Sequence, residues 1–338
     1  MTRIGPTTHV LLLGATGGIG SSVMEALLVR GARVRALSRN AAQAAARNRL
    51  VDWRQGDAME VQDVRAAAEG VDIIVHAVNP PRYRHWDRLV LPMLENTIAA
   101  ARATGATILL PGTVYNFGPD VFPLIPDDAP QNPVTGKGEI RKAMEIRLQD
   151  AAKAGVRSIV LRAGDFFGPS VGNSWFAQVL VSPGRPVGTI TLPGDSGIGH
   201  QWAYLPDVAA AMLALLDRRD TLAPFEAAQF GGTWDEDGLV LARSIRRAVE
   251  RPDLPVRSFP WWTLPLAAPF SETVREIRAM RYLWRRPVRM DNAKLVGLIG
   301  EEPHTPLDGA IATTLRGLGC LSADQRDRAA GFPQALLR

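Results

Sequence analysis

The 338-residue sequence predicts an α/β protein, built as a doubly wound parallel sheet with a smaller, discontinuous C-terminal lobe. Three observations support this fold class. Strand-like and helix-like segments alternate up to residue 165, which is typical of a parallel sheet with helices on both faces. An apolar run at residues 9–13 ends abruptly in glycines. Beyond residue 165 the alternation stops, and the chain is longer than one simple core requires.

The alternation defines the expected elements in order. Strands are expected at residues 9–13, 33–37, 50–54, 72–78, 107–111 and 157–162, and helices at 19–30, 61–69, 87–104 and 138–154. After a Gly- and Pro-rich stretch, further helices are expected near 207–218, 271–284, 291–299 and 307–317. We therefore assign residues 1–165, with 200–220 returning to them, to a nucleotide-binding domain, and 166–199 and 221–338 to the smaller lobe. Any ligand should lie beyond the carboxyl ends of the strands.

The first strand leads into the segment HVLLLGATGGIG at residues 9–20. Gly14 permits a tight turn, Gly17 lets the backbone approach a pyrophosphate, and Gly20 lets the helix pack near the strand. The amides at the helix start would face the phosphates. A plain strand–helix turn is the alternative. The segment thus predicts a Rossmann-type dinucleotide site, and we count its other loop residues as cofactor contacts: Thr16, Gly18 and Ile19.

The second strand indicates which dinucleotide binds. An NAD site places a carboxylate near the end of this strand, whereas this chain has Ser38 and Arg39 there. Because a guanidinium suits a 2′-phosphate, we expect NADP, with NAD possible; alternatively, Arg39 is a solvated loop residue. Asp57, followed by Ala58, could accept from the adenine amino group or cap the next helix. The small residues at the end of the fourth strand would leave room for the ribose and nicotinamide: Ala77, Val78 and Asn79.

Composition narrows the function classes. The net charge is +5, but the basic residues are scattered, so we expect no nucleic-acid partner. The single cysteine, Cys320, excludes an intrachain disulfide and a cysteine zinc site. The five histidines show no metal-ligand spacing, so no metal is expected. No apolar run is long enough to span a membrane, and the N-terminus lacks the pattern of a signal peptide. We expect a cytoplasmic protein with no membrane partner.

Five segments in this order resemble the extended short-chain dehydrogenases/reductases, the NAD(P)-dependent epimerase/dehydratase group. They are GATGGIG (14–20), TVYNFG (113–118), LRAGDFFGP (161–169), HQWAYLPDVAAAM (200–212) and DNAKLVGLIGEEPHTPL (291–307). The resemblance implies that Thr113 stands at the catalytic Ser/Thr position and Phe117 at the Tyr of Val-Tyr-Gly. It implies that residues 161–169, with Ala163 and Gly164, cover the nicotinamide. It also implies a homodimer through two long sheet-flanking helices.

One departure from that family affects the chemistry. The usual Tyr-x-x-x-Lys pair is replaced by Lys137 and Arg141, in the segment TGKGEIRKAME. The family's usual Asn on the preceding helix also has no clear match. Fold and cofactor can therefore be inferred from the resemblance, whereas the usual proton relay cannot.

The remaining residues offer two proton donors. Thr113 can donate a hydrogen bond but is a poor acid, and Arg141 can hold ribose hydroxyls but carries a fixed charge. Lys137, partly desolvated near another cation, could have a lowered pKa and act as the acid. Tyr115 is the second candidate, because in an extended segment residues 113, 115 and 117 point to one side.

A structural interpretation of the same residues is also open. Arg141 and Glu145 could pair on a helix surface, and Lys137 could be a solvated residue in the first helical turn. Asp165 could contact the cleft or cap a loop. The tryptophans at 261, 262 and 284 could line an apolar substrate pocket, form a subunit contact, or belong to the core of the lobe.

These observations favour an NADPH-dependent reductase of a small organic carbonyl or activated alkene. A sugar-nucleotide epimerase or dehydratase is the rival enzyme; it needs a working Tyr and a second, basic diphosphate site, for which Arg185, Arg243 and Arg289 are unplaced candidates. A non-catalytic NADP(H)-binding protein with a redox-sensing or regulatory role would explain the lost Tyr most simply.

Overall fold

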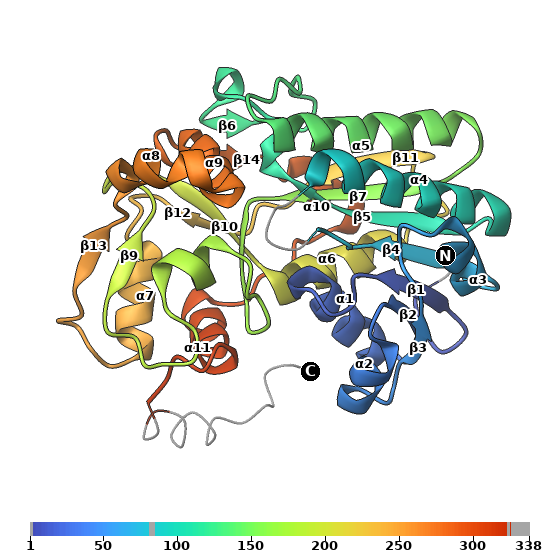
Figure 1. Cartoon of the computed structure of the whole chain (residues 1–338), viewed down its shortest axis with the longest axis horizontal. Coiled ribbons are helices and arrows are strands. Elements are labelled where there is room, and N and C mark those ends of the chain that lie inside the picture. Colours follow the sequence, from blue (N-terminus) through green and yellow to red (C-terminus); the bar gives the residue numbers. More distant parts are fainter. Residues whose placement is uncertain (1–2, 81–84, 323–324, 326–338) are drawn as a thin grey trace.

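The nucleotide-binding domain is built on a seven-stranded parallel sheet in the order β11-β7-β5-β4-β1-β2-β3 (Figure 1). The computed structural model describes residues 3–80, 85–322 and 325. The strands are β1 (His9–Leu13), β2 (Arg33–Ser38), β3 (Asp52–Gln55), β4 (Ile73–His76), β5 (Thr107–Thr113), β7 (Ser158–Ala163) and β11 (Phe225–Gln229). The strand order reverses between β1 and β4, so the crevice for a ligand lies at the carboxyl ends of these two strands.

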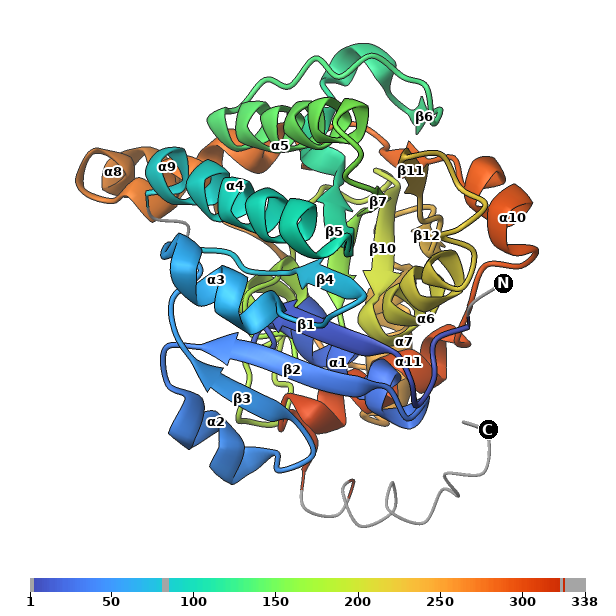
Figure 2. The ribbon, with the colours of Figure 1, turned by 90° about the vertical axis from the view of Figure 1, so that its right-hand side faces the viewer.

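Helices cover both faces of this sheet. Figure 2 shows α3 (Val61–Ala68), α4 (Trp86–Thr104) and α5 (Gly136–Lys153) on one side, and α1 (Gly18–Val29) with α6 (Leu205–Leu216) on the other. The apolar run of β1 serves both layers, because alternate side chains of a strand point to opposite faces. Val10 and Leu12 pack in the core beneath α1 and α6, whereas Leu11 and Leu13 pack beneath α3 and α4. A short helix, α2 (Ala41–Arg47), connects β2 to β3.

The smaller lobe has its own core and its own short sheets. One sheet has the order β12-β10-β8, made of β12 (Thr233–Asp235), β10 (His200–Tyr204) and β8 (Asp165–Phe167). Two strand pairs join β13 (Val256–Ser258) to β9 (Ile190–Leu192), and β14 (Arg289–Met290) to β6 (Leu124–Ile125). The helices are α7 (Val240–Ala248), α8 (Leu264–Ala267), α9 (Glu272–Ala279) and α11 (Leu307–Gly317). Shorter helical turns lie at Val114–Asn116, Pro119–Val121, Phe176–Leu180, Trp261–Thr263, Ala268–Phe270 and Met280–Trp284.

The α/β class and every expected strand up to residue 162 are confirmed, but the domain boundaries are partly wrong. Strand β11, which we expected in the lobe (221–338), is the edge strand of the large sheet beside β7. Helix α10 (Ala293–Ile299) packs against α6 and β11, so it too belongs to the nucleotide-binding domain. Of the returning segment 200–220, only α6 packs on the large sheet; β10 pairs with β8 and β12 in the lobe.

The three tryptophans of interest differ in their surroundings. Trp284 is buried in the lobe core, Trp261 is half-buried against that core, and the side chain of Trp262 is 76% exposed. The core interpretation therefore holds for Trp284 and does not hold for Trp262. Within the described ranges, no helix is both long and apolar enough to cross a membrane.

Candidate cofactor cleft and active site

Two glycines of the β1–α1 loop are required by the packing of the chain itself. Gly14 has a positive φ of 91°, and a Cβ added there would lie 2.5 Å from the backbone oxygen of Ala77. A Cβ on Gly20 would lie 2.1 Å from the backbone oxygen of Gly14. Gly14 therefore lets β1 turn beside the end of β4, and Gly20 lets α1 approach the loop closely.

Gly17 has a different environment. It is exposed, and an added Cβ would meet only the oxygen of Gly14, at 3.4 Å. It is also the N-cap of α1, with no side-chain hydrogen bond and no acidic residue in the first helical turn. The backbone amides at this helix start are open to an anion. The loop residues Thr16, Gly18 and Ile19 are exposed or half-buried beside it. This loop therefore fits a pyrophosphate.

The ends of β2 and β3 form the next part of the cleft. Ser38 accepts a hydrogen bond from the amide of Asn40 at 3.2 Å, and the Arg39 side chain is exposed beyond it. Asp57 accepts from the amide of Met59 at 3.0 Å. The helix-cap alternative for Asp57 is wrong, because α3 begins after Glu60. The carbonyl of Ala58 is held by the side chain of Asn96 on α4 at 3.0 Å.

Arg141 joins the ends of β4 and β5. Its Nη2 donates to the Oδ1 of Asn79 at 3.4 Å, and its Nη1 donates to the carbonyl of Pro111 at 3.4 Å. Its guanidinium carbon lies 5.1 Å from the centre of the Trp86 ring. The surface-pair alternative is wrong, because Arg141 is buried and Glu145 binds elsewhere. Ala77 and Val78 are half-buried next to Asn79.

His76, the last residue of β4, lies close to Arg141. Burial lowers its pKa to about 3, with a further contribution from the Arg141 charge. Its Nδ1 lies 2.8 Å from the hydroxyl of Thr97, which itself donates to the carbonyl of Met93. Nδ1 therefore carries the proton, and the buried Nε2 has no hydrogen-bond partner among the described residues. The sequence places His76 within the expected strand 72–78 without indicating a role; a histidine within an apolar strand is the available signal.

Lys137 lies in the first turn of α5, behind the N-cap Thr135. The solvated alternative is wrong, because the residue is only 4% exposed. Its Nζ lies 3.3 Å from the Oε2 of Glu276 on α9 and 5.7 Å from the centre of the Trp86 ring. A carboxylate at this distance favours the charged ammonium. Lys137 therefore links the nucleotide-binding domain to the lobe.

Thr113 and Tyr115 lie where β5 ends. The expected extended segment is wrong, because Val114–Asn116 forms a 3-10 turn and Phe117 is fully buried in the lobe core. The Thr113 hydroxyl oxygen instead accepts from the amide of Tyr115 at 3.2 Å. The phenol of Tyr115 reaches the Oδ1 of Asp165 at 3.5 Å. The turn therefore directs Tyr115 towards the lobe strand β8.

Asp165 and His200 form a buried pair behind Tyr115. The Nε2 of His200 lies 2.8 Å from the Oδ2 of Asp165, and both side chains are about 5% exposed. The His200 ring stacks on Trp284, with 3.8 Å between ring centres and 23° between the planes. The loop-cap alternative for Asp165 is wrong, because its two oxygens face Tyr115 and His200. His200 was not predicted to be part of a site; a histidine at the start of the segment HQWAY was the available signal.

The residues expected beside the nicotinamide precede Asp165. Ala163 is a buried residue of β7, and Gly164 follows it. A Cβ on Gly164 would lie 2.6 Å from the backbone oxygen of Gln201. This glycine is therefore required by the close approach of β10.

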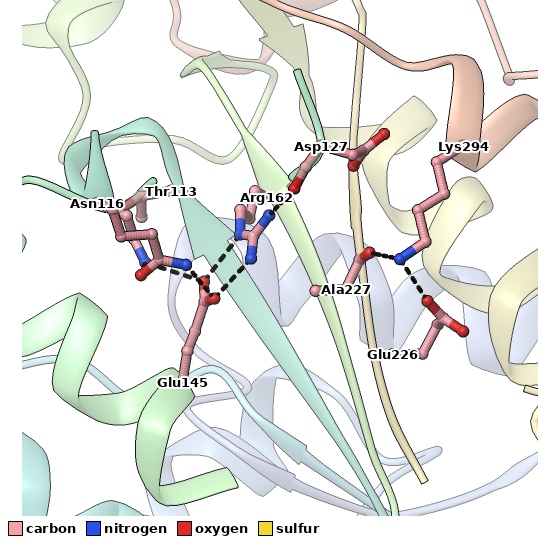
Figure 3. A network of polar contacts seen from close by, with 9 residues as sticks. Thr113, Asn116, Asp127, Glu145, Arg162, Glu226, Ala227 and Lys294 are labelled. Carbon is pink, nitrogen blue, oxygen red and sulfur yellow. Dashed lines mark hydrogen bonds and ion pairs between the residues drawn. The ribbon is translucent and has the colours of Figure 1, made fainter. Parts of the chain in front are cut away.

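A buried polar network holds Asn116, the last residue of the Val114–Asn116 turn (Figure 3). Glu145 of α5 accepts from the Nδ2 of Asn116 at 2.9 Å and from the Nε and Nη2 of Arg162 at 3.0 and 2.7 Å. Gln131 donates to the same carboxylate at 2.7 Å. Arg162 continues to the carbonyl of Asp127, whose carboxyl pKa is raised by burial. Glu145 was expected only as a surface partner of Arg141, and the network itself was not predicted, since its contacts join distant parts of the chain.

Two of the arginines proposed for a second diphosphate site have other partners. Arg243 forms an ion pair with Asp237 at 2.7 Å, and Arg289 lies over the ring of Trp234, 5.8 Å from its centre. Over the residues that the structure describes, no three His, Cys, Asp or Glu side chains come together as metal ligands.

Comparison with known proteins agrees with this geometry. Residues 14–143 match a family described as NAD(P)H-binding. A 3-diazoavenalumate denitrifying reductase from a Streptomyces species is 29% identical over 233 residues, covering 63% of this chain and 73% of the relative. The fold is similar to a solved UDP-galactose 4-epimerase (TM-score 0.67, 18% identity, 96% of this chain and 100% of that one). It is also similar to the UDP-glucose 4-epimerase of Brucella ovis in complex with NAD (TM-score 0.72, 18% identity, 92% and 98%).

These similarities confirm the Rossmann-type α/β fold, which the chain shares with the solved epimerases. They also assign NAD(P) binding to the domain that carries the glycine loop. The fold shared with the epimerases does not transfer their substrates, because function depends on the residues of the site.

Proposed function

We propose that this protein is an NADPH-dependent reductase of a small organic carbonyl or activated alkene. The observation that carries the proposal is the Tyr115 phenol, which comes from the turn after β5 and is hydrogen-bonded to buried Asp165. A proton donor is thus available at the edge of the sheet where the glycine loop lies. The likeness to a named reductase over 73% of its length supports the same reaction class.

Different residues of the chain would have different roles in a reduction. A bound nicotinamide supplies hydride. The Gly14–Gly20 loop would hold the pyrophosphate, and Arg141 would hold the ribose near Asn79. Tyr115 donates the proton that the reduced substrate requires. Lys137 is the weaker candidate for this proton, because its ion pair with Glu276 stabilises the charged form.

Arg39 supports a preference for NADP. Its exposed guanidinium follows the end of β2, at the place where an NAD site has a carboxylate. A permanently charged fork binds a 2′-phosphate well. The fixed charge therefore favours NADPH over NADH.

The test is calorimetric titration of NADPH and NADH into wild type, Arg39→Ala and Arg47→Ala. Arg47 is the matched control, since it is another exposed arginine, at the end of α2. We expect Arg39→Ala to lose about tenfold in NADPH affinity, the value of one charge-assisted contact, with NADH binding unchanged. Arg47→Ala should behave as wild type. Equal binding of both cofactors by wild type would contradict the NADP assignment.

Turnover is then measured as NADPH oxidation with a panel of aromatic aldehydes, ketones and α,β-unsaturated carbonyls. Reduction of one of these by wild type, and its loss in Tyr115→Phe, would support the reductase. Tight NADPH binding with no turnover on any of them would favour the non-catalytic binding protein instead.

We also propose a cytoplasmic homodimer that pairs through the outer faces of α4 and α5. The Ile146 side chain on α5 is 46% exposed there, next to the Arg147–Glu95 ion pair that joins the two helices at 2.7 Å. An apolar side chain on this face could be covered by the same face of a second copy.

A further inference from the structure

We propose that Asp165 and His200 are positioning residues whose shared protonation state decides whether Tyr115 can donate its proton. This inference rests on the proposed reductase function. The three residues form one line of contacts: Tyr115 Oη to Asp165 Oδ1 at 3.5 Å, and Asp165 Oδ2 to His200 Nε2 at 2.8 Å. They come from three elements: the turn after β5, the lobe strand β8 and the lobe strand β10.

The pair is built so that one histidine nitrogen can take up a proton. The His200 Nε2 faces the carboxylate of Asp165, so it carries a hydrogen in the neutral ring. The Nδ1 is buried and has no hydrogen-bond partner in the part of the chain that the structure describes. His200 also lines a cavity of about 20 Å³ together with Asp235 and Trp284, enough for a single water molecule. Protonation at Nδ1 would place an imidazolium against the indole ring of Trp284.

The two protonation states act on Tyr115 in opposite ways. When His200 is neutral, the pair carries one negative charge, which attracts the phenolic proton to Asp165 and opposes formation of a phenolate. When His200 is protonated, the pair is neutral overall, and the Tyr115 O–H bond breaks more easily as a bond from that hydrogen forms to the substrate. The phenolate keeps the electron pair and takes a proton from solvent after the product leaves. Reduction should therefore require protonated His200.

Two other ionisable groups, Asp235 and Tyr282, face the Asp165–His200 pair and contribute to its electrostatic environment. Asp235 of β12 is buried, which raises its pKa, and the charge of His200 acts in the opposite direction. Tyr282, from the helical turn Met280–Trp284, faces Asp165; burial and then the Asp165 charge raise its pKa, so it stays a neutral phenol. Tyr282 donates to the carbonyl of Phe117 at 3.3 Å and is not part of the line.

A test that needs no substrate uses the full chain with bound NADPH, labelled with ¹³Cζ-tyrosine and ¹⁵N-histidine. Spectra of Tyr115→Phe and His200→Gln assign the two residues. We expect the Tyr115 resonance to titrate with the same apparent pKa as the His200 ring nitrogens. The step should vanish from the Tyr115 resonance in His200→Gln, because the amide keeps a hydrogen bond to Asp165 but does not titrate. In Asp165→Asn the His200 ring still titrates, but the step in the Tyr115 resonance should shrink, because the carboxylate that joins the two residues is gone. If one of them does not fold, the other carries the test.

Tyr282→Phe is the matched control, since it removes the other phenol facing Asp165 and should leave the titration of Tyr115 intact. A Tyr115 resonance that ignores the titration of His200 would overturn the proposal. The titration is measured without any reaction. A negative result would therefore contradict the role of the Asp165–His200 pair without bearing on whether the protein is a reductase.

The kinetic counterpart uses 4-nitrobenzaldehyde and NADPH. Above the apparent pKa of the pair, kcat of wild type and of Tyr282→Phe should fall about tenfold per pH unit, as expected for one required proton. His200→Gln should give a lower, flat profile, because the negative charge of Asp165 then persists at every pH. Asp165→Asn removes that charge, so it should keep its activity above the apparent pKa and lose the pH dependence. Variants that retain the wild-type slope would contradict the role of the pair.

Discussion

Gly14, Gly17 and Gly20 share one motif but are glycines for different reasons. Gly14 and Gly20 have no room for a Cβ, because backbone atoms of the chain itself lie 2.5 and 2.1 Å from where it would be. Gly17 has room, since its nearest neighbour would be 3.4 Å away. Its requirement for glycine must come from outside the chain, which is the expected effect of a pyrophosphate at the helix start.

The substitutions Gly17→Ala and Gly20→Ala should therefore affect different properties, the first the affinity for NADPH and the second the stability of the fold. We expect Gly17→Ala to keep the wild-type melting temperature and to bind NADPH about tenfold more weakly, as the methyl group keeps the phosphate away. Gly20→Ala should cost about 1–3 kcal/mol of stability through overpacking. Thermal melts and calorimetry separate the two effects. A large loss of stability in Gly17→Ala would argue against a ligand role.

The residue type at a motif position and the contacts made there also differ in the proposed proton donor. Lys137 stands where the resembled family has its catalytic Tyr, whereas the phenol that reaches buried Asp165 belongs to Tyr115. The lysine has been drawn into an ion pair with Glu276 of the lobe. A position in a motif thus predicts where the backbone of a residue lies. The contacts of its side chain determine whether it is available to donate a proton.

Helix α5 shows how one element serves several neighbours. Lys137 points to α9, Arg141 to the ends of β4 and β5, and Glu145 to Arg162 of β7. Glu145 and Arg162 are both almost fully buried. A buried charge that loses its partner is strongly destabilising.

We therefore expect Glu145→Gln to lower the unfolding free energy by about 3–5 kcal/mol, because the buried Arg162 would lack a counter-charge. The measurement is urea denaturation followed by circular dichroism. Asp150→Asn is the control on the same helix, since Asp150 pairs with Lys153 at the surface and such pairs contribute little. If both variants lost a similar unfolding free energy, the loss would reflect a general sensitivity of helix α5. It would then not be evidence that burial of the Glu145–Arg162 pair matters.

At the scale of the whole molecule, the candidate site residues lie where the large sheet meets the lobe. Contacts cross this boundary at Lys137–Glu276 and at Tyr115–Asp165, and β11 and α10 return from the C-terminal half to the large sheet. The two parts therefore share chain segments as well as a cleft. We expect them to respond together to conditions that destabilise either one.

Acid should be one such condition, because His76 is buried as a neutral ring. Its folded pKa of about 3 lies below the ordinary value of 6.5, so the unfolded state binds a proton first as the pH falls. This contribution to stability is complete above pH 6.5 and is lost progressively as the pH falls from 6.5 towards 3. Between pH 7 and pH 5 the loss is about 2 kcal/mol.

The check compares unfolding free energies at pH 7 and pH 5 in wild type, His76→Gln and His9→Gln. His76→Gln should lose less stability than wild type over this interval, by about 2 kcal/mol. His9, the half-exposed first residue of β1, is the control and should leave the pH dependence unchanged. An unaltered pH dependence in His76→Gln would mean that the ring does not enter the core as the neutral form.

Local pattern was sufficient for the sheet domain. The apolar run of β1, the glycine spacing and the alternation of elements gave the fold class, the strands of the large sheet up to β7 and the loop that fits a pyrophosphate. These features depend on backbone geometry and on periodic burial, which neighbouring residues encode. The return of β11 to the sheet was not predicted, because the five-residue stretch Phe225–Gln229 contains Glu226 and Gln229 and so lacks the apolar pattern of a buried strand.

The chain's own order of residues determined the cofactor loop, the missing Tyr-x-x-x-Lys pair and the candidates Thr113, Tyr115 and Lys137. Only the tertiary structure shows which partners these residues have: Tyr115 reaches Asp165, and Lys137 pairs with Glu276. Tyr115 and Asp165 are 50 residues apart, and Asp165 and His200 are 35 apart, so no local spacing could reveal that they touch. Their charges and proton positions depend on burial and on partners brought in from other elements. Those quantities exist only once the chain has folded.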